Sequence, residues 1–263
     1  KIVSVIEMIE KIIETVKKAG EIYKNAAGNL GIECKGSTVN LVTEYDKKIQ
    51  DFLFEALSKI IPDCSFLGEE GEGNKDLSDG YCFIIDPIDG TTNFIKGFQH
   101  SAISVGLAKD KELIAGVVYD PDLDNIYYAE KGKGAYLNGK QIHVSECDLQ
   151  NSLVLFGTCP YEHELAEKTF ALTKEVFYNA IEVRRGGSAA LDICYVAAGK
   201  ADLYYELIVR PWDFSGATII LEEAGGNCCT LEKESINCGK ASSYLCGNQN
   251  NIKQFFRIAD EIL

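Results

Sequence analysis

The segment 86–92, DPIDGTT, places two carboxylates beside hydroxyl and backbone groups that can donate hydrogen bonds. It follows the apolar run 81–85, which is typical of a buried strand, so Asp86 is expected at a strand end. Pro87 favours extended geometry at Asp86, and Gly90 permits a sharp turn with close approach to a ligand. Carboxylates near phosphate suit Mg²⁺, and N–H groups that open a helix would bind phosphate. The segment predicts a metal and phosphate site, with an acidic helix-capping turn as the alternative.

Two further acidic clusters support the metal interpretation. Glu69 and Glu70 follow the short apolar stretch 66–68, although a glutamate pair alone is more typical of a solvated face. Asp213 follows Trp212 and begins an apolar helical pattern that runs to the glycine pair 225–226. Taken alone, Asp213 would be interpreted as an ordinary helix N-cap.

Taken together and in this order, the three clusters resemble the inositol monophosphatase family of magnesium-dependent, lithium-sensitive phosphatases. The matching segments are GEE at 68–70, DPIDGT at 86–91, and WD at 212–213 followed by EAGG at 223–226. The resemblance extends from the first predicted helix nearly to the end of the chain. It implies an α+β fold, the layered αβαβα sandwich of the inositol monophosphatase and fructose bisphosphatase type.

The resemblance also implies a set of two to three Mg²⁺ ions per site. Glu69, Asp86 and the backbone carbonyl of Ile88 would hold the first ion. Asp86, Asp89 and Asp213 would hold the second, and Glu69 would help with a weaker third. Without cations, carboxylates about 4 Å apart would repel one another by on the order of 4 kcal/mol per pair at an effective dielectric constant near 20.

For catalysis, the resemblance assigns Thr91, paired with Asp46, to polarise the attacking water, and Glu70 to hold a neighbouring water. Asp46 also follows Thr43 by three residues, so a capping box at a helix start explains it equally well. The leaving alkoxide would be protonated by water at the second ion, so no histidine is needed. The three histidines, which fall outside these clusters, are His100, His143 and His163.

The substrate-side residues come from the same resemblance. Ser188 replaces a threonine of the family's alcohol-pocket turn, and Glu206 matches a residue that accepts hydrogen bonds from inositol hydroxyls. Lys35 matches a mobile loop close to the metals, with a surface hairpin as the alternative. The implied substrate-binding residues are Asp89, Gly90, Thr91, Gly187, Ser188, Ala189 and Glu206.

Composition sets further limits. The chain has 263 residues, 46% of them hydrophobic, and a net charge of −14, which opposes binding to nucleic acid or an anionic membrane. No apolar run approaches the roughly 18 residues of a membrane span, and no signal-peptide pattern opens the chain. Ten cysteines without a C-x-x-C pattern indicate a reducing cytoplasm, with thiol regulation through Cys228 or Cys238 as the alternative.

The pattern of elements changes near residue 148. Before it, helices are expected over 2–23 and 44–61, and antiparallel strands dominate from 101 to 144, with a tight turn at Asn138-Gly139. After it, strands alternate with helices near 162–178, 188–199 and 214–224, and a last helix closes the chain. We therefore expect an N-terminal part, 1–148, with most metal ligands, and a C-terminal part, 149–263, with Asp213 and the substrate-side residues. A homodimer is expected by analogy with the family alone.

Three functions remain open at this stage. The first is a Mg²⁺-dependent phosphomonoesterase acting on myo-inositol 1-phosphate or a close polyol phosphate. The second is a relative acting on fructose 1,6-bisphosphate or 3'-phosphoadenosine 5'-phosphate; the segment 92–94, TNF, and Glu206 favour inositol phosphate instead. The third is a regulatory or binding protein with secondary phosphatase activity, whose partner surface would include Arg184, Arg185 and Arg210.

Overall fold

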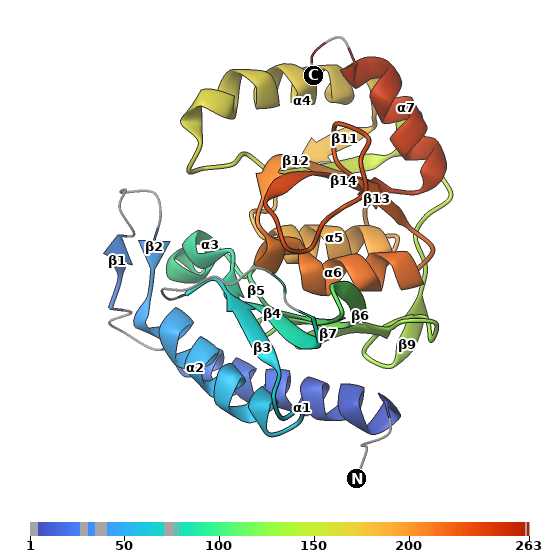
Figure 1. Cartoon of the computed structure of the whole chain (residues 1–263). Helices are drawn as coiled ribbons and strands as arrows, with labels where there is room; N and C mark the ends of the chain where they lie inside the picture. Colours follow the sequence, from blue (N-terminus) through green and yellow to red (C-terminus); the bar gives the residue numbers. More distant parts are fainter. Residues whose placement is uncertain are drawn as a thin grey trace.

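The structure, a computed structural model, describes residues 5–26, 31–34, 41–70, 77, 79–260 and 262. Helices and sheets alternate in five layers (Figure 1), which confirms the expected αβαβα sandwich. The outer helical layer consists of α1 (Val5–Lys24) and α2 (Glu44–Ser58), because both helices carry an apolar face that packs on the first sheet. Helix α2 ends at Ser58, three residues before the predicted end.

The first sheet has seven strands in the described part of the chain, in the order β3-β4-β5-β6-β7-β8-β9. Strand β3 runs parallel to β4, and every later neighbour is antiparallel, which confirms the expected meander. Asn138 and Gly139 both have positive φ, as a tight hairpin turn requires. The strands are β3 (Ser65–Gly68), β4 (Tyr81–Asp89), β5 (Ala102–Lys109), β6 (Glu112–Asp120), β7 (Asn125–Glu130), β8 (Ala135–Leu137) and β9 (Lys140–Ile142).

The central layer holds α5 (Ala189–Ala197) and α6 (Pro211–Glu223), which lie between the two sheets. Helix α6 can approach the first sheet closely because glycines meet there. A Cβ added to Gly116 of β6 would lie 2.1 Å from the backbone oxygen of Gly216 in α6. Helix α6 begins at Pro211, three residues before the prediction, because proline fits the first turn of a helix. Asp213 therefore lies inside the first turn.

The second sheet has five strands in the order β11-β10-β12-β14-β13, and mixes parallel and antiparallel pairs. Its outer face is covered by α4 and α7. The predicted helix 162–178 divides into a short 3₁₀ turn, η2, and α4. The elements of this half are η1 (Leu149–Asn151), β10 (Leu153–Phe156), η2 (His163–Leu165), α4 (Ala166–Asn179), β11 (Glu182–Arg184), β12 (Leu203–Val209), β13 (Asn227–Cys229), β14 (Ser242–Gly247) and α7 (Gln249–Ala259).

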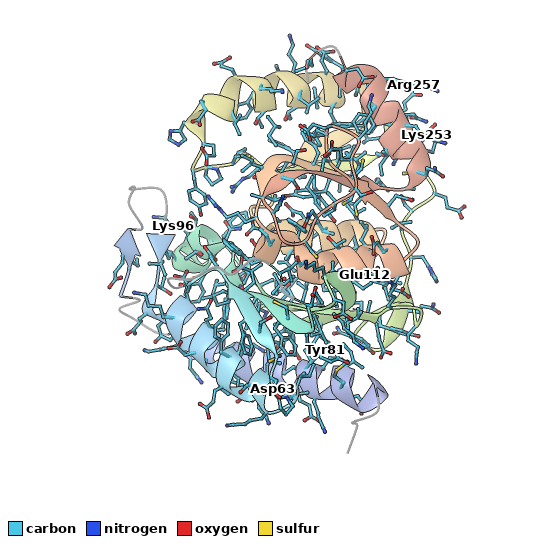
Figure 2. All side chains as sticks on the ribbon, viewed as in Figure 1. Asp63, Tyr81, Lys96, Glu112, Lys253 and Arg257 are labelled. Atoms are coloured by element: carbon cyan, nitrogen blue, oxygen red, sulfur yellow. The ribbon has the colours of Figure 1, made fainter. Side chains whose placement is uncertain are left out.

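Three apolar clusters fill the spaces between the layers, and the middle cluster joins residues from both sides of residue 148. Charged side chains such as Glu112, Lys253 and Arg257 project from the outside (Figure 2). The division into 1–148 and 149–263 stays a prediction. No helix in the described ranges is long and apolar enough to cross a membrane.

Two small elements complete the molecule near the site. Strands β1 (Glu33–Cys34) and β2 (Leu41–Val42) form an antiparallel pair, and α3 (Thr91–Lys96) follows β4 directly. Lys35, which the family resemblance places in a mobile loop, lies outside the described residues.

Candidate active site

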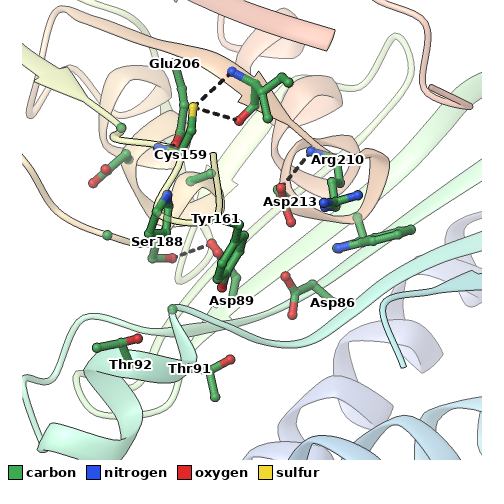
Figure 3. A pocket seen from close by; sticks show the side chains of 18 of the residues that line it. Asp86, Asp89, Thr91, Thr92, Cys159, Tyr161, Ser188, Glu206, Arg210 and Asp213 are labelled. Atoms are coloured by element: carbon green, nitrogen blue, oxygen red, sulfur yellow. Dashed lines mark hydrogen bonds between the residues drawn. The ribbon is translucent and has the colours of Figure 1, made fainter. Parts of the chain in front are cut away.

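A pocket of about 370 Å³ opens between the two sheets and is lined by residues from both halves of the chain. Four of the predicted acidic ligands, Glu69, Asp86, Asp89 and Asp213, contribute to its wall. Figure 3 shows the aspartates turned toward a common space. The structure thus brings together carboxylates that lie up to 144 positions apart in the sequence.

A β-bulge lets Asp86 and Asp89 serve the same pocket. Side chains alternate along a strand, so two residues three positions apart would ordinarily face opposite sides of the sheet. Asp86 pairs with Ser104 and Asp89 with Ala102, so β4 spans three positions where β5 spans two. Pro87, which has no N–H for the ladder, lies inside this bulge. The extra residue returns Asp89 to the pocket side.

The parallel register of β3 and β4 places Glu69 beside Asp86. Gly68 pairs with Ile85, and the Glu69 N–H donates to the Ile85 carbonyl at 3.2 Å. The Glu69 and Asp86 carboxyl groups lie within hydrogen-bonding reach of each other. Asp213 is oriented by its own helix start, where Oδ2 accepts a 2.7 Å hydrogen bond from the Arg210 N–H. The N-cap of α6 is Arg210, so the simpler interpretation of Asp213 as the N-cap is wrong; Asp213 is the third residue of the helix, and its side chain bonds back to the N-cap backbone while it also lines the pocket.

Burial and mutual repulsion make the carboxyl groups of Asp86, Asp89 and Asp213 reluctant to ionise. Desolvation and the charges of Glu69, Asp89 and Asp213 raise the pKa of Asp86 well above its ordinary value. Burial raises the pKa of Asp89 to about 7, although hydrogen bonds from Ser188 and Ala190 oppose the shift. Burial and the charge of Asp89 likewise raise the pKa of Asp213. A cation in the pocket would relieve this repulsion.

The donor chemistry of the site fits Mg²⁺, which binds carboxylate and carbonyl oxygens. In the described ranges, no lysine or arginine forms an ion pair with Asp86, Asp89 or Asp213. No three His, Cys, Asp or Glu side chains of those ranges are arranged closely enough to enclose a metal ion as they stand. The match therefore lies in the oxygen set and its burial.

Thr91 and Asp46 meet as predicted. The Thr91 hydroxyl donates to the Ile88 carbonyl at 3.1 Å and lies 3.4 Å from Asp46 Oδ1. Asp46 Oδ2 accepts from the N–H and hydroxyl of Thr43, which completes the capping box of α2. Burial raises the pKa of Asp46 to about 6. Both interpretations of Asp46 thus agree with the geometry.

Hydrogen bonds with the side chain of Gln50 hold the backbone of Glu70 in place. Gln50, buried in α2, accepts from the Glu70 N–H at 2.9 Å and donates to the Glu70 carbonyl. Among the described residues that line the pocket, Glu69 is present and Glu70 is not. Sequence reasoning missed Gln50, because an amide within a helix gives no local signal of a partner twenty residues away.

On the opposite wall, the start of α5 holds Asp89. Ser188 is the N-cap of α5, and its hydroxyl donates to Asp89 Oδ2 at 2.5 Å. The Ala190 N–H donates to the same oxygen at 2.7 Å. Asp89 Oδ2 is thus occupied by α5, and this arrangement fixes the position of Oδ1.

Glu206 lines the pocket at the end expected for the leaving alcohol, and it is also anchored by protein groups. It accepts from the Tyr204 hydroxyl at 2.6 Å and from the Cys159 N–H at 2.8 Å. Cys159 has φ of 43°, a strained conformation for a residue other than glycine, and its sulfur accepts from the Ile208 N–H at 3.2 Å. This anchored turn places Tyr161 in the pocket wall (Figure 3).

Sequence reasoning missed Cys159, Tyr161 and the inward position of Arg185. The Cys-Pro-Tyr sequence at 159–161 is a turn signal that could have drawn attention to the first two. All three arginines are exposed, but Arg185 and Arg210 line the pocket, whereas Arg184 does not and pairs with Glu182 at 3.1 Å. No local sequence pattern shows which of the two adjacent arginines, Arg184 or Arg185, lines the pocket.

The nine cysteines whose side chains the structure describes, which leave out Cys34, are all free thiols. Cys82, Cys194 and Cys246 are buried, as their apolar surroundings predict. Burial raises the pKa of Cys228 to about 12, which makes its thiol a poor nucleophile at neutral pH. Redox regulation through Cys228 or Cys238 therefore gains no support.

Comparison with known proteins agrees with this fold and site. The family model of the inositol monophosphatase family matches residues 5–262. Inositol monophosphatase 3 of Solanum lycopersicum is 40% identical over 230 residues, 85% of each chain. A fructose-1,6-bisphosphatase/inositol-1-monophosphatase of Aquifex aeolicus is 38% identical over 228 residues, 84% of this chain and 86% of the relative.

Among solved structures, the extragenic suppressor protein suhB of Bartonella henselae superposes with a TM-score of 0.90 at 29% identity, over 97% of this chain and 99% of the other. The layered fold is that of the inositol monophosphatases. The chain belongs to the inositol monophosphatase family.

Proposed function

We propose that the protein is a Mg²⁺-dependent phosphomonoesterase that hydrolyses myo-inositol 1-phosphate, or a close polyol phosphate, to the alcohol and phosphate. The observation that carries this proposal is the convergence of Glu69, Asp86, Asp89 and Asp213 on one pocket in a chain of this family. The names of the relatives, among them the tomato inositol monophosphatase, agree with the substrate class.

Two to three Mg²⁺ ions would be held by this chain's oxygens. Glu69, Asp86 and the Ile88 carbonyl would hold one, and Asp86, Asp89 and Asp213 a second. When bound, Mg²⁺ supplies charge to stabilise the phosphoryl oxygens and lowers the pKa of bound water. The buried carboxylates contribute their placement, because the bulge in β4 and the start of α6 fix their backbones before any ion binds.

Thr91 and Asp46 would orient the attacking water. The Thr91 hydroxyl is already aimed between the Ile88 carbonyl and Asp46, so a water that accepts from or donates to Thr91 would share this network. The raised pKa of Asp46, about 6, suits a group that accepts a proton near neutral pH. Glu70 would hold a second water, with its backbone fixed by Gln50.

The leaving alcohol would bind between Asp89, Ser188 and Glu206. Glu206 can still accept further hydrogen bonds. Each of its carboxylate oxygens has two lone pairs and accepts one hydrogen bond from the protein. The segments 90–91 and 187–189 also line the pocket. Together these residues would bind a polyol through several hydroxyl groups.

A second candidate substrate is fructose 1,6-bisphosphate. Arg185 and Arg210 lie in the pocket wall, where a guanidinium group could bind a second phosphate in a bidentate manner. The printed name of the Aquifex relative includes both activities. This observation favours a bisphosphate as an additional substrate.

A homodimer remains a proposal. The outer face of α4 and the residues after it expose Phe170, Phe177, Tyr178 and Ile181, and Tyr178 is 68% exposed. An apolar group of this kind is typical of a surface that a partner covers. The net charge of −14 opposes a nucleic acid partner, and free thiols agree with a cytoplasmic protein.

The direct test is phosphate release with and without Mg²⁺ from myo-inositol 1-phosphate, glycerol 2-phosphate, fructose 1,6-bisphosphate and 3'-phosphoadenosine 5'-phosphate. The Asp86→Asn variant serves as control. We expect inositol 1-phosphate to be the best substrate and lithium to suppress the reaction. Preference for a bisphosphate would move the assignment within the superfamily. Absence of Mg²⁺-dependent release from all four would overturn it and favour the regulatory function.

A further inference from the structure

A buried histidine and aspartate join the two halves of the chain behind the pocket. His100 Nε2 lies 3.0 Å from Asp192 Oδ1, and their side chains are only 13% and 2% exposed. His100 lies between α3 and β5, and Asp192 lies in α5. Asn93 of α3 adds a second link, because its Nδ2 donates to the His100 carbonyl at 2.7 Å and to the Gly186 carbonyl at 3.0 Å.

This pair supports the turn that precedes α5. A Cβ added to Gly186 would lie 2.1 Å from Asp192 Oδ1 and 2.5 Å from His100 Nε2, so the turn packs directly on the pair. The Gly187 N–H donates to Asp192. Gly187 has φ of 94°, which a side chain would oppose. The backbone conformation of the turn therefore depends on its contacts with His100 and Asp192.

The same turn leads into the groups that hold Asp89. Ser188 and Ala190 donate to Asp89 Oδ2, and Ser188 follows Gly187 directly in the sequence. An unbroken series of contacts thus runs from His100 through Asp192 and the turn to Asp89. Movement of the turn would shift both donors and release the fixed orientation of the Asp89 carboxylate.

We propose that His100 and Asp192, linked through Asn93, are positioning residues that keep the turn 186–188 in place and thereby orient Asp89 toward the metal-binding space. The inference rests on the proposed function in one respect, the assignment of Asp89 as a Mg²⁺ ligand. Partners that orient a ligand commonly contribute a factor of about 10 to 100 to metal affinity. We expect the lower end here, because the pair acts through the turn.

The test compares His100→Phe, which keeps the bulk and removes the polar group, with His100→Gln, which keeps a donor near the position of Nε2. Thr173→Val is the matched control, since it removes a buried 2.7 Å hydrogen bond to Tyr205, and neither residue lines the pocket. Three quantities are measured for each variant: the Mg²⁺ dissociation constant of the substrate-free protein by calorimetry, the Mg²⁺ concentration for half-maximal activity, and Tm.

His100→Phe is expected to weaken Mg²⁺ binding about tenfold and to raise the half-activating concentration similarly, and His100→Gln to recover most of the loss. Thr173→Val should lower Tm with no change in the Mg²⁺ dissociation constant. If folded His100→Phe, or His100→Ala where Phe prevents folding, binds Mg²⁺ as tightly as the parent, the pair is only structural and the inference is wrong. Asp89→Asn separates the two proposals, because unchanged Mg²⁺ binding in that variant would contradict the ligand assignment itself.

Discussion

The carboxylate of Asp46 connects a helix start to the pocket, because Oδ2 binds Thr43 at 2.6 and 2.7 Å while Oδ1 lies 3.4 Å from the Thr91 hydroxyl. One side chain thus caps α2 and reaches the residue proposed to orient water. The two roles can be separated by substitution, since only the second requires Oδ1.

Asp46→Asn is expected to lower kcat by a factor of about 100, the low end of what general-base groups contribute. Thr43→Ala is the matched variant, because it removes the cap and leaves Oδ1 in place. That variant should lose about 1 kcal/mol of unfolding free energy while the folded enzyme keeps most of its kcat. Steady-state kinetics and urea unfolding of both proteins check this. Equal kcat losses in the two would show that Asp46 acts through the helix alone.

Asp86→Asn should change stability in opposite directions with and without metal. In chelator, the substitution removes a buried charge that repels Glu69, Asp89 and Asp213, so Tm should rise or stay level. With Mg²⁺, the parent protein should gain stability and the variant should gain little, because a ligand stabilises the folded state by an amount that grows with the logarithm of its concentration divided by its dissociation constant. Thermal unfolding in both buffers measures the effect. A parent protein that gains nothing from Mg²⁺ would contradict the proposed site.

His100 should make stability fall with rising pH. Burial lowers the pKa of His100, but the hydrogen bond and charge of Asp192 outweigh this and raise it above 6.5. The folded state therefore binds the proton more tightly than the unfolded state does, and the stabilisation is complete below pH 6.5 and lost as pH rises through the folded pKa. Asp89 and Asp120 act on His100 in the same direction.

The measurement is urea unfolding at pH 6 and pH 8 for the parent protein and His100→Gln. Other groups titrate in both proteins, so the difference between them isolates His100. The parent should lose more stability than the variant over this interval. A parent with the same pH dependence as His100→Gln would show that His100 does not change its protonation on folding.

Phe177→Glu should prevent dimer formation if the exposed face of α4 joins two copies. The charge would lie among Phe170, Tyr178 and Ile181, where a partner's apolar surface would leave it unpaired. Phe98→Glu, at a residue 65% exposed near α3, is the control. Light scattering should give twice 28.9 kDa for the parent and control, and 28.9 kDa for Phe177→Glu. A Phe177→Glu dimer would place the interface elsewhere.

Arg185→Ala tests the second substrate. If the guanidinium binds the distant phosphate of fructose 1,6-bisphosphate, the variant should lose about 1.5 kcal/mol, roughly tenfold in kcat/KM, for that substrate and much less for inositol 1-phosphate. Arg184→Ala is the neighbouring control, since Arg184 is exposed and paired with Glu182. Equal losses on both substrates would indicate that Arg185 supports the pocket wall in general.

Much of this protein follows from local sequence. The apolar faces of α1 and α2 and the capping box at Thr43 and Asp46 depend on neighbours a few residues away, so pattern and propensity predict them. The strand predicted over 81–85 continues to Asp89, so Asp86 lies inside β4 and not at its end, because pairing with β5 resumes beyond the bulge. The start of α6 was misplaced because apolar periodicity begins after the first turn, whereas Pro211 already occupies it. Short acidic clusters in a fixed order identified the family.

What only the tertiary structure decided is how distant residues meet. Asp86 and Asp89 share a pocket because β4 bulges against β5, and Glu69 reaches them because β3 pairs with β4 in one register. Ser188 holds Asp89 from 99 positions away. Such contacts depend on strand pairing and layer packing, which are set by the summed burial of the whole core. The sequence alone therefore determined which groups could carry out the chemistry, and the packing of the two sheets around α5 and α6 decided where those groups lie.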